Sequence, residues 1–396
     1  MKRLGVILWF FLLLVCCAGA ETADVLSVGS RGDQVLEVKK QLHALRYYRT
    51  GTLTRQYTED TAERVRKFQQ INGLPETGEV DAATAAMLFS PEALKAPWPT
   101  MPPLATPAPT PIPDWPPRDA AGYLAEGGEY YYENDAEGLW IYLSENLQIT
   151  ILRREDADAS LIWFETDILT RNGESFRAVA TDPERPGKDY RLPDQIAREE
   201  GFVLGFSDDF YAYRMNKKET VGIILRNGAV ISETTNARTG HHLPNLDMMA
   251  QFPDGSLQVY ACAEHTAEEF LEMGAVNVFS FGPYLLRDGE INELVYTYFK
   301  SLEPRHALGM IAPGHYFLLS VQGRTHSSDG TTLQRVAEMM QAKGVTQALN
   351  LDGGNTMALA FHGRLLNEPA IYKNKKFVRT VTSMIGIGST AYTPLP

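Results

Sequence analysis

Cysteine is scarce in this sequence. Three cysteines occur in 396 residues, and two of them, Cys16 and Cys17, lie in the first twenty. If that segment is removed, only Cys262 remains, so no internal disulfide can form. We interpret Cys262, in "LQVYACAEH", as a buried strand residue rather than a nucleophile, because no base with an orienting partner accompanies it.

Positive charge and metal-ligand spacings are also lacking. The net charge of -12 argues against nucleic acid or an extended polyanion as the main partner, although a small basic pocket remains compatible with it. The pairs His241-His242 and Glu264-His265 have no further ligand at helical spacing. We therefore predict no metal site and no cofactor, with a divalent cation as the alternative.

Residues 1–20 have the pattern of a signal peptide. Lys2 and Arg3 precede an apolar run that is too short to span a bilayer, and a small-residue cleavage motif ends at Ala20. An uncleaved anchor, or a lipid on Cys16 or Cys17, is the alternative. The segment predicts a secreted protein of the bacterial cell wall, with no membrane span after its removal.

Residues 25–90 predict a small module of three helices. Apolar residues recur at helical spacing in "DQVLEVKKQL" and "EDTAERVRKF", and a third short helix follows in "AATAAML". Asp33, Thr58 and Asp81 stand at the expected helix starts as candidate caps.

This module resembles the peptidoglycan-binding domain-like family. The resemblance covers the module and rests on an ordered set of residues: Thr61, Phe68-Gln69, Gly73-Leu74, Gly78 and Thr84. It implies peptidoglycan as a partner of residues 25–90. The turn "RTGTLTRQYTEDT" lacks the Asp-Gly that is usual before the second helix, so a purely structural bundle is the alternative.

Residues 91–118 hold nearly half of the prolines of the chain. Proline fixes φ and lacks an N–H donor, so this segment predicts a stiff, extended linker. Such a linker would hold a second domain near the surface that the first module binds.

Residues 119–394 predict a larger domain rich in strands. Alternating apolar residues, the hairpin signal Asn227-Gly228 and the helix "TTLQRVAEMMQAKG" indicate strands with interspersed helices. The fold class predicted for the whole chain is therefore multidomain, with a small three-helix bundle and a larger α+β domain around a mixed β-sheet.

The stretch "NLDGGNTM" places Asp352 and two glycines between two apolar runs. Glycine lets the backbone approach a ligand closely and can aim successive N–H groups at one anion. Asn355 and Thr356 add short polar side chains. A rigid functional carboxylate is one interpretation, and a solvated hairpin turn is the other.

Further polar residues could serve the same site. Asp329 precedes the clearest helix, whose N-terminus presents free N–H groups, and Arg324 could reach the same space. Arg305 is the best phosphate candidate because its planar fork binds two oxygens, and Arg379 could point inward from the start of a strand. The neighbouring His306 is a candidate proton donor or a structural histidine.

These stretches resemble the phosphodiester glycosidase family over roughly residues 200–390. The resemblance rests on "SFGPYLLRDG", "PRHALGM", "GRTHSSDGTTLQRVAEMMQAKGV", "ALNLDGGNTM" and "VRTVTSMIGIG", taken in order. Ser207 and Asp208 depart from the usual Asn-Gly of the early segment, and Asn355-Thr356 replace a glycine and a serine. The departures bear on the substrate more than on the reaction class.

The resemblance implies an exported, cell-wall-associated hydrolase that cleaves a glycosyl phosphodiester, with a phosphodiester-linked carbohydrate as substrate. Cleavage needs a carboxylate and neutralisation of the phosphate. The predicted catalytic residues are Asp352, Asp329 and Asp209, and the predicted substrate-binding residues are Arg305, Gly353, Gly354, Asn355, Thr356, Arg379 and Gly282. A non-catalytic carbohydrate-binding surface protein and a peptidoglycan hydrolase are the alternatives.

Overall fold

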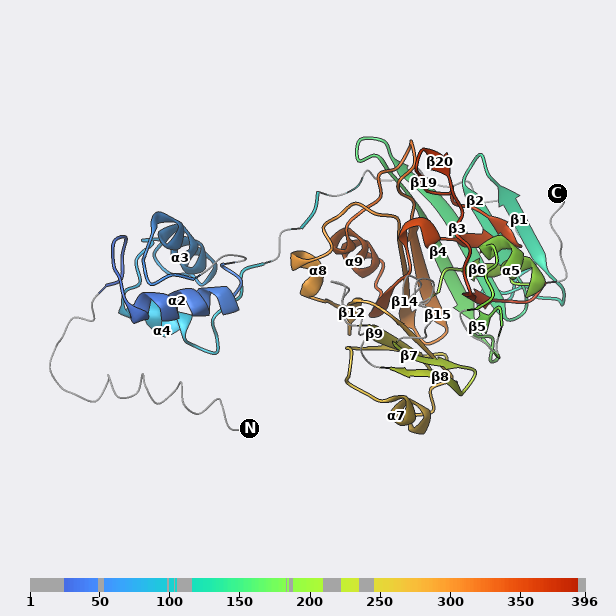
Figure 1. Ribbon diagram of the computed structural model, residues 1–396, viewed down its shortest axis with the longest axis horizontal. Coiled ribbons are helices and arrows are strands. Elements are labelled where there is room, and N and C mark those ends of the chain that lie inside the picture. The colour runs from blue at the N-terminus through green and yellow to red at the C-terminus, as the bar shows by residue number, and fades with distance from the viewer. Residues whose placement is uncertain are drawn as a thin grey trace. The chain divides into compact units, whose positions relative to one another are not determined.

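The computed structural model describes residues 25–48, 53–97, 100–102, 104, 116–182, 184, 188–208, 222–234 and 246–390. The chain divides into two compact units, Met1–Pro99 and Thr100–Pro396 (Figure 1). The predicted signal segment at 1–20 lies outside the described residues. Within the described part of the chain, no helix is both long and apolar enough to cross a bilayer.

The first unit contains the three predicted helices, α2 (Asp33–Ala44), α3 (Glu59–Ile71) and α4 (Ala82–Leu88). Thr58 caps α3 in a capping box with Thr61, and the Asp81 side chain accepts from the Thr84 N–H, as predicted. The prediction for Asp33 is wrong: Gly32 occupies the N-cap position, and Asp33 is the first helical residue, bonded to Arg55. The helices pack around a core that includes Val35, Leu42, Val65 and Phe68.

The ends of the proline-rich segment pack on the two units. Ala96 N–H donates to the Leu45 carbonyl in the first unit. In the second unit, Met101 N–H lies 3.3 Å from a Glu338 carboxylate oxygen, and Leu104 packs against the apolar core. Described residues of the predicted linker, 91–118, therefore contact the two folded units. Residues 105–115 lie outside the described residues.

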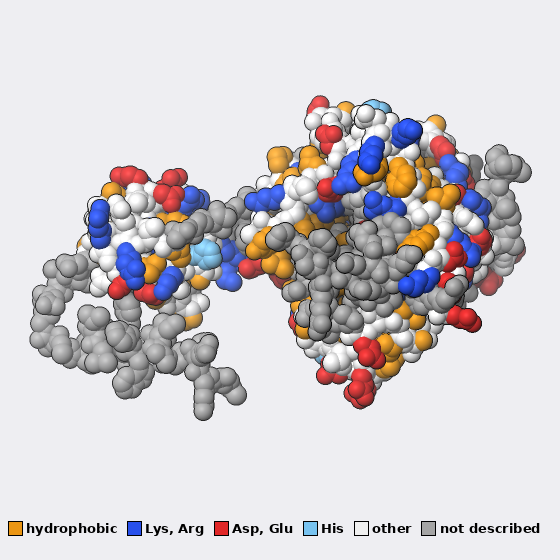
Figure 2. Space-filling view, viewed as in Figure 1, with side chains coloured by type: hydrophobic (Ala, Val, Ile, Leu, Met, Phe, Trp, Pro, Cys, Tyr) orange, Lys and Arg blue, Asp and Glu red, His pale blue; other side chains and the backbone are white. Residues whose placement is uncertain are grey.

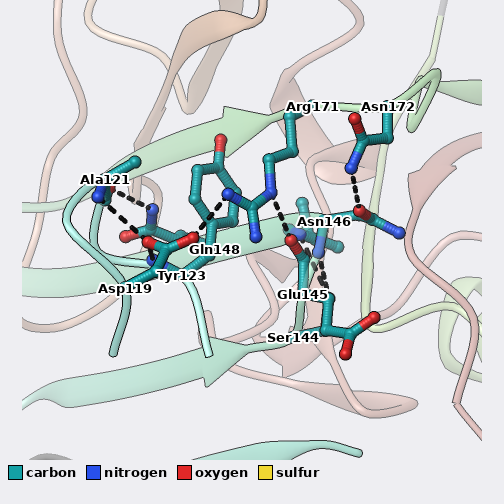
Figure 3. A network of polar contacts seen from close by, with 10 residues as sticks. Asp119, Ala121, Tyr123, Ser144, Glu145, Asn146, Gln148, Arg171 and Asn172 are labelled. Atoms are coloured by element: carbon teal, nitrogen blue, oxygen red, sulfur yellow. Dashed lines mark hydrogen bonds and ion pairs between the residues drawn. The ribbon is translucent and has the colours of Figure 1, made fainter. Parts of the chain in front are cut away.

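A polar network fixes the chain where it enters the larger sheet (Figure 3). The Arg171 guanidinium donates to Asp119 Oδ2 at 2.6 Å and to the Glu145 carbonyl at 2.5 Å, and it lies 4.1 Å from the centre of the Tyr123 ring. Arg118 and Leu124 form an isolated β-bridge in the same segment. These contacts join the segment 118–124 to Arg171, and Arg171 to Glu145, within the larger unit.

The largest sheet has nine strands. Their spatial order is β1 (Tyr130–Asn134), β2 (Leu139–Leu143), β3 (Leu147–Asp156), β4 (Leu161–Thr170), β15 (His315–Val321), β14 (Arg305–Ala312), β16 (Gln347–Leu351), β12 (Tyr284–Arg287) and β13 (Glu290–Ile291). Every strand pairing among the described residues is antiparallel. The larger domain is therefore mostly β, and its main sheet is antiparallel rather than mixed.

Two five-stranded sheets accompany it. One has the order β10 (Leu257–Tyr260), β9 (Asp247–Gln251), β11 (Asn277–Phe281), β7 (Gly222–Arg226) and β8 (Ala229–Thr234). The other has the order β18 (Arg364–Leu365), β17 (Leu359–Phe361), β6 (Leu204–Phe206), β21 (Ser383–Ile387) and β5 (Arg177–Ala180). The predicted Asn227-Gly228 turn joins β7 to β8, with both residues at positive φ.

The main sheet buries both of its faces because its strands alternate two apolar sets. Leu308 and Leu349 point into a core shared with β6 and β9, whereas Ala307 and Ala348 point toward α9 (Leu333–Ala342) on the other face. The remaining helices are α5 (Pro193–Glu199), α7 (Ala267–Glu272) and α8 (Leu294–Thr297), and β19 (Ile371–Tyr372) pairs with β20 (Lys375–Lys376) in a separate hairpin. The loops at one end of β14 and β16 thus stand on a rigid, fully packed support.

Candidate active site

Asp352 follows directly on β16 and is only 8% exposed. Its N–H donates to the Asp208 carbonyl at 3.0 Å, which joins the end of β16 to the residues after β6. The Ser207 hydroxyl donates to the Thr356 carbonyl and accepts from the Ala358 N–H, both at 2.7 Å. Hydrogen bonds to the residues that follow β6 therefore hold the Asp352 backbone in one place.

The residues after Asp352 form a 3-10 turn, Gly354–Thr356, rather than a hairpin turn. A Cβ on Gly353 would lie 2.5 Å from the Pro304 carbonyl oxygen, so only glycine fits there. Gly354, at φ +57, donates its N–H to the same oxygen at 2.9 Å. This N–H is consequently engaged with the backbone and not presented to an anion.

Three glycines from two stretches of the chain lie against the backbone of residues 303–304. A Cβ on Gly330 would overlap the Glu303 carbonyl, and one on Gly323 would lie 2.8 Å from the Pro304 nitrogen. Gly353 packs against the Pro304 carbonyl oxygen, as described above. The stretches "EPRHALGM", "GRTHSSDG" and "LDGGNT", which the sequence analysis singled out separately, therefore meet at one point.

The Arg305 side chain joins two nearby backbone segments by hydrogen bonds. Its Nε donates to the Thr331 carbonyl at 3.1 Å and its Nη2 to the Ser301 carbonyl at 3.0 Å. Burial lowers the pKa of Arg305 to about 10, a shift that the charge of Glu303 opposes. The guanidinium is therefore still charged at neutral pH and joins the loop before β14 to the residues before α9.

Arg324 is the cation that contacts the residues after Asp352. Its Nη1 donates to Asn355 Oδ1 at 2.8 Å, and its Nη2 forms an ion pair with Glu303. Asn355 and Arg324, which the sequence analysis singled out separately, are therefore in contact. Arg324 lies at φ +53 and keeps 41% of its side chain exposed, so its charge also faces solvent at this rim.

Asp208, whose carbonyl accepts the Asp352 N–H, forms a buried ion pair with Arg226. Asp208 is 6% exposed, and its Oδ2 lies 3.7 Å from Arg226 Nη2. Arg226 also donates to the Val278 carbonyl at 2.9 Å and lies 5.2 Å from the centre of the Phe279 ring. Sequence reasoning treated Asp208 as a departure from a motif and missed Arg226. The signal was an arginine that ends the apolar run "GIILR".

Gly282 is structural rather than open to a ligand. Its N–H donates to the Asn350 backbone carbonyl, and its own carbonyl accepts from Asn350 Nδ2 at 2.8 Å. A Cβ at this position, where φ is +86, would lie 2.9 Å from Asp247 Cβ. Asp247 in turn accepts the N–H groups of Cys262 and Tyr284. Cys262 lies after β10 and is half-buried, not inside a strand.

Of the other two predicted carboxylates, one is exposed and one lies outside the described residues. Asp329 is exposed, and its N–H donates to the Ser160 carbonyl in the turn between β3 and β4. Thr332, not Asp329, caps α9. Asp209 lies outside the described residues. Arg379 is half-buried and lies before β21, which begins at Ser383, so it does not open that strand.

His306 lies under the site, paired in register with Leu351, the residue before Asp352. Its ring is fully buried, and its Nδ1 lies 2.9 Å from Ser320 Oγ. Burial lowers the pKa of His306 from 6.5 to about 3. The ring is therefore neutral at neutral pH, which fits a structural histidine better than a proton donor.

The low pKa of His306 predicts a loss of stability in acid. Between pH 6.5 and about 3 the unfolded chain binds a proton that the folded protein excludes, so stability present above pH 6.5 falls as the pH falls. We expect His306 to contribute about 2 kcal/mol to the loss between pH 7 and pH 5. Urea unfolding, followed by the fluorescence of Trp140 and Trp163, should show a smaller loss for His306→Asn. Equal losses in both proteins would contradict this assignment.

The first unit carries a groove of about 530 Å³. Its lining is mainly polar and includes four cations and two acids: Arg46, Arg64, Arg66, Lys67, Glu63 and Glu76, together with Tyr47, Gln70, Ala96 and Pro97. Among the residues that the structure describes in the whole chain, no group of three or more His, Cys, Asp or Glu side chains is arranged to hold a metal ion.

Comparison with known families agrees with both resemblances. The phosphodiester glycosidase family model matches residues 200–388, and the putative peptidoglycan binding domain model matches residues 31–88. The solved structure of the zebrafish N-acetylglucosamine-1-phosphodiester alpha-N-acetylglucosaminidase catalytic domain, auto-inhibited by its pro-peptide, superimposes with a TM-score of 0.50 at 19% identity. That match covers 62% of this chain and 85% of the zebrafish chain, and it shows a shared fold.

Two curated proteins match over shorter stretches. The SPbeta prophage-derived uncharacterized protein YomE of Bacillus subtilis (strain 168) is 30% identical over 134 residues, which are 33% of this chain and 21% of YomE. The N-acetylglucosamine-1-phosphodiester alpha-N-acetylglucosaminidase of Bos taurus is 25% identical over 224 residues, which are 51% of this chain and 40% of the bovine protein. This chain thus spans less than half the length of either relative.

Proposed function

We propose, from the premise that residues 200–388 form a phosphodiester glycosidase domain, that this protein hydrolyses the bond between a sugar and a phosphodiester. The observation that carries the proposal is Asp352. It is a buried carboxylate at the end of β16, backbone-bonded to Asp208 and fixed by two sheets. The name of the bovine relative, which states activity on N-acetylglucosamine-1-phosphodiester, supports the reaction class.

The reaction needs less acid catalysis than ordinary glycoside hydrolysis. When the bond between sugar C1 and oxygen breaks, the electron pair goes to a phosphate oxygen, which is a weak base with a second pKa near 6. Water then supplies the hydroxyl group at C1, and its proton passes to a base. A carboxylate is required on the sugar side to stabilise the positive charge at C1 or to activate the water. Asp352 is proposed for that role.

The phosphate side requires positive charge. Arg324 contacts the turn after Asp352, and Arg226 lies beside Asp208. Charge-assisted hydrogen bonds from a guanidinium are about twice as strong as neutral ones, so either side chain can stabilise phosphate oxygens as charge develops on them. Asn355 and Thr356 remain proposed substrate contacts. Arg305 is proposed to act by positioning, because it donates to two backbone carbonyls.

Asp208 is proposed as the partner carboxylate in preference to the exposed Asp329. Asp208→Asn should lower kcat/KM for a UDP-sugar about 100-fold, because it removes a buried charge from the residue whose carbonyl accepts the Asp352 N–H and leaves Arg226 without that carboxylate. Asp329→Asn should change it by less than about threefold. Release of free sugar measures both, with thermal melting as a check on folding. A large effect at Asp329 with none at Asp208 would reverse the assignment.

We also propose that residues 31–88 attach the protein to peptidoglycan, outside the cell that makes it. The family match supports this attachment, and the mixed-charge groove of the first unit offers a surface for the charged peptides of peptidoglycan. The predicted signal segment supports export. Sedimentation of the full chain with purified sacculi tests the attachment.

A further inference from the structure

The hairpin of β19 and β20 differs in charge from the rest of the protein. From Pro369 to Thr382 the chain carries Lys373, Lys375, Lys376 and Arg379 and no acidic residue, whereas the whole protein has a net charge of -12. All three lysines are exposed. In Figure 2, blue and orange side chains gather at the top of the larger unit, where Figure 1 places β19 and β20.

Two aromatic side chains stand exposed among these lysines. Tyr372 is 49% and Phe377 42% exposed, and their ring centres lie 6.1 Å apart at an interplanar angle of 46°. The Lys373 Nζ lies 5.3 Å from the centre of the Tyr372 ring. The two rings together offer an exposed apolar surface to a ligand. We call residues 371–377 the basic aromatic hairpin.

The turn of this hairpin has two residues in the left-handed region of the backbone. Lys373 and Asn374 occupy the two central positions at φ +49 and φ +62. These positions favour Asn, Asp or Gly, and a lysine there has a conformational cost. Strain of this kind is commonly stored at functional positions.

The basic aromatic hairpin is fixed to the rim of the candidate site. Ile371 N–H donates to the carbonyl of Arg324 at 2.7 Å, and the Arg324 side chain bonds Asn355. The segment leading to the hairpin is also tied down: Asn367 Oδ1 accepts from the Leu359 N–H, and Glu368 N–H donates to Gln322 Oε1. The exposed rings therefore stand on the backbone that shapes the site.

We propose that the basic aromatic hairpin binds the segment of an anionic polysaccharide next to the scissile bond. The weakly positive C–H faces of sugar rings pack on the electron-rich faces of Tyr372 and Phe377. The lysines attract the negatively charged groups of the polymer. The site then acts on a phosphate-bearing glycan chain rather than on a small molecule. This substrate class rests on the proposed function, whereas the binding does not.

The negative net charge of the protein confines its contact with an anionic polymer to a small area. A polyanion is repelled by most of the surface, so only a short stretch of the polymer meets positive charge, at the hairpin and Arg324. Binding should consequently weaken as ionic strength rises, because exposed charges are screened beyond about 8 Å at physiological salt. A contact of the lysines with an anionic membrane would depend on salt in the same direction but would not require sugars.

The test compares hairpin variants in the full chain carrying Asp352→Asn, which prevents turnover. Affinity electrophoresis in phosphomannan, a polysaccharide with sugar-1-phosphodiester links, measures binding. Tyr372→Ala with Phe377→Ala should weaken it about tenfold. The triple change of Lys373, Lys375 and Lys376 to Gln should weaken it several-fold and reduce its salt dependence. Phosphate-free mannan should bind more weakly and lose the lysine effect.

A matched control is Tyr298→Ala with Lys300→Gln. Both residues are exposed, and they lie just after α8, which Figure 1 shows well separated from β19 and β20. The control should bind phosphomannan like the parent. Equal binding by the hairpin variants and the parent would overturn the proposal. So would binding of the hairpin to phosphatidylglycerol vesicles with no effect on phosphomannan, which would assign it to a membrane surface.

The kinetic consequence separates this proposal from the proposed function. In the chain with Asp352 intact, the hairpin variants should raise KM for phosphomannan about tenfold and leave kcat/KM for a small UDP-sugar unchanged. If no donor is hydrolysed but the variants still lose binding, the proposed function fails and the hairpin proposal stands. If the UDP-sugar is hydrolysed and the variants bind phosphomannan like the parent, the hairpin proposal fails and the proposed function stands.

Discussion

Asp352→Asn is expected to lower kcat/KM for a glycosyl phosphodiester about a thousand-fold, within the range for loss of a catalytic carboxylate. The substitution keeps the size of the side chain and removes its charge. The backbone bond from residue 352 to the Asp208 carbonyl stays available, so the two sheets should remain joined. Release of free sugar from a UDP-sugar measures the effect, and a melting curve close to that of wild type would show that the loss is chemical.

The matched control is Asp158→Asn. Asp158 is an exposed carboxylate in the turn between β3 and β4, so removal of its charge should leave activity and stability nearly unchanged. An Asp352→Asn protein that folds and hydrolyses the donor as fast as the control would remove Asp352 from the mechanism.

Gly353→Ala is expected to lower the free energy of unfolding by roughly 2 kcal/mol, the usual cost of an added methyl group in a packed site. The new Cβ would lie 2.5 Å from the Pro304 carbonyl oxygen, a backbone atom that cannot move without shifting Arg305. Activity should therefore fall as well, by at least about tenfold, because the loops around Asp352 separate. Urea unfolding and sugar release measure the two effects.

Gly127→Ala serves as the control for Gly353→Ala. A Cβ on Gly127 would meet only the end of the Glu145 side chain, at 3.4 Å, and its φ lies outside the left-handed region. We expect a change of less than about 0.5 kcal/mol. If Gly353→Ala were as well tolerated as this control, the close packing of the three glycines around residues 303–304 would not matter for the site.

Local features of the fold were predictable because they depend on neighbouring residues. The capping box of Thr58, the Asn227-Gly228 turn and helix α9 are each specified within a few positions of the chain. The prediction for Asp33 failed because Gly32, one residue earlier, takes the cap position and Asp33 pairs with Arg55. The antiparallel direction of the strands in the main sheet was not predicted, because strand direction depends on pairings between distant residues that no local pattern reveals.

The candidate site was predictable only in part. The glycines of "LDGGNT" identified the position of Asp352, since glycine next to a carboxylate between apolar runs is a local signal. The Asp208–Arg226 pair was not predicted, because it joins residues after β6 to the end of β7 and needs the assembled sheets. Gly282 and Gly354 were assigned to ligand binding, yet both engage backbone groups. In a single sequence, a glycine needed for packing resembles one needed for binding.

The two units have different chemical surfaces. The groove of the first unit mixes cations and acids, whereas the basic aromatic hairpin of the second has exposed cations and rings, with Glu368 paired to Lys376. A mixed-charge groove suits peptides that carry both signs of charge, and the hairpin suits an anionic glycan. Proposed together, they would place a glycosyl phosphodiesterase activity on anionic polymers that lie close to peptidoglycan.

The central claim is that Asp352 serves a cleavage on the sugar side of a glycosyl phosphodiester. Hydrolysis of a UDP-sugar in water enriched in ¹⁸O tests it most directly, with mass spectrometry of the released nucleotide. Cleavage between C1 and oxygen predicts free sugar together with UDP that contains no ¹⁸O. Incorporation of ¹⁸O into a phosphate group of the nucleotide, or the absence of any product from wild-type protein, would contradict the account.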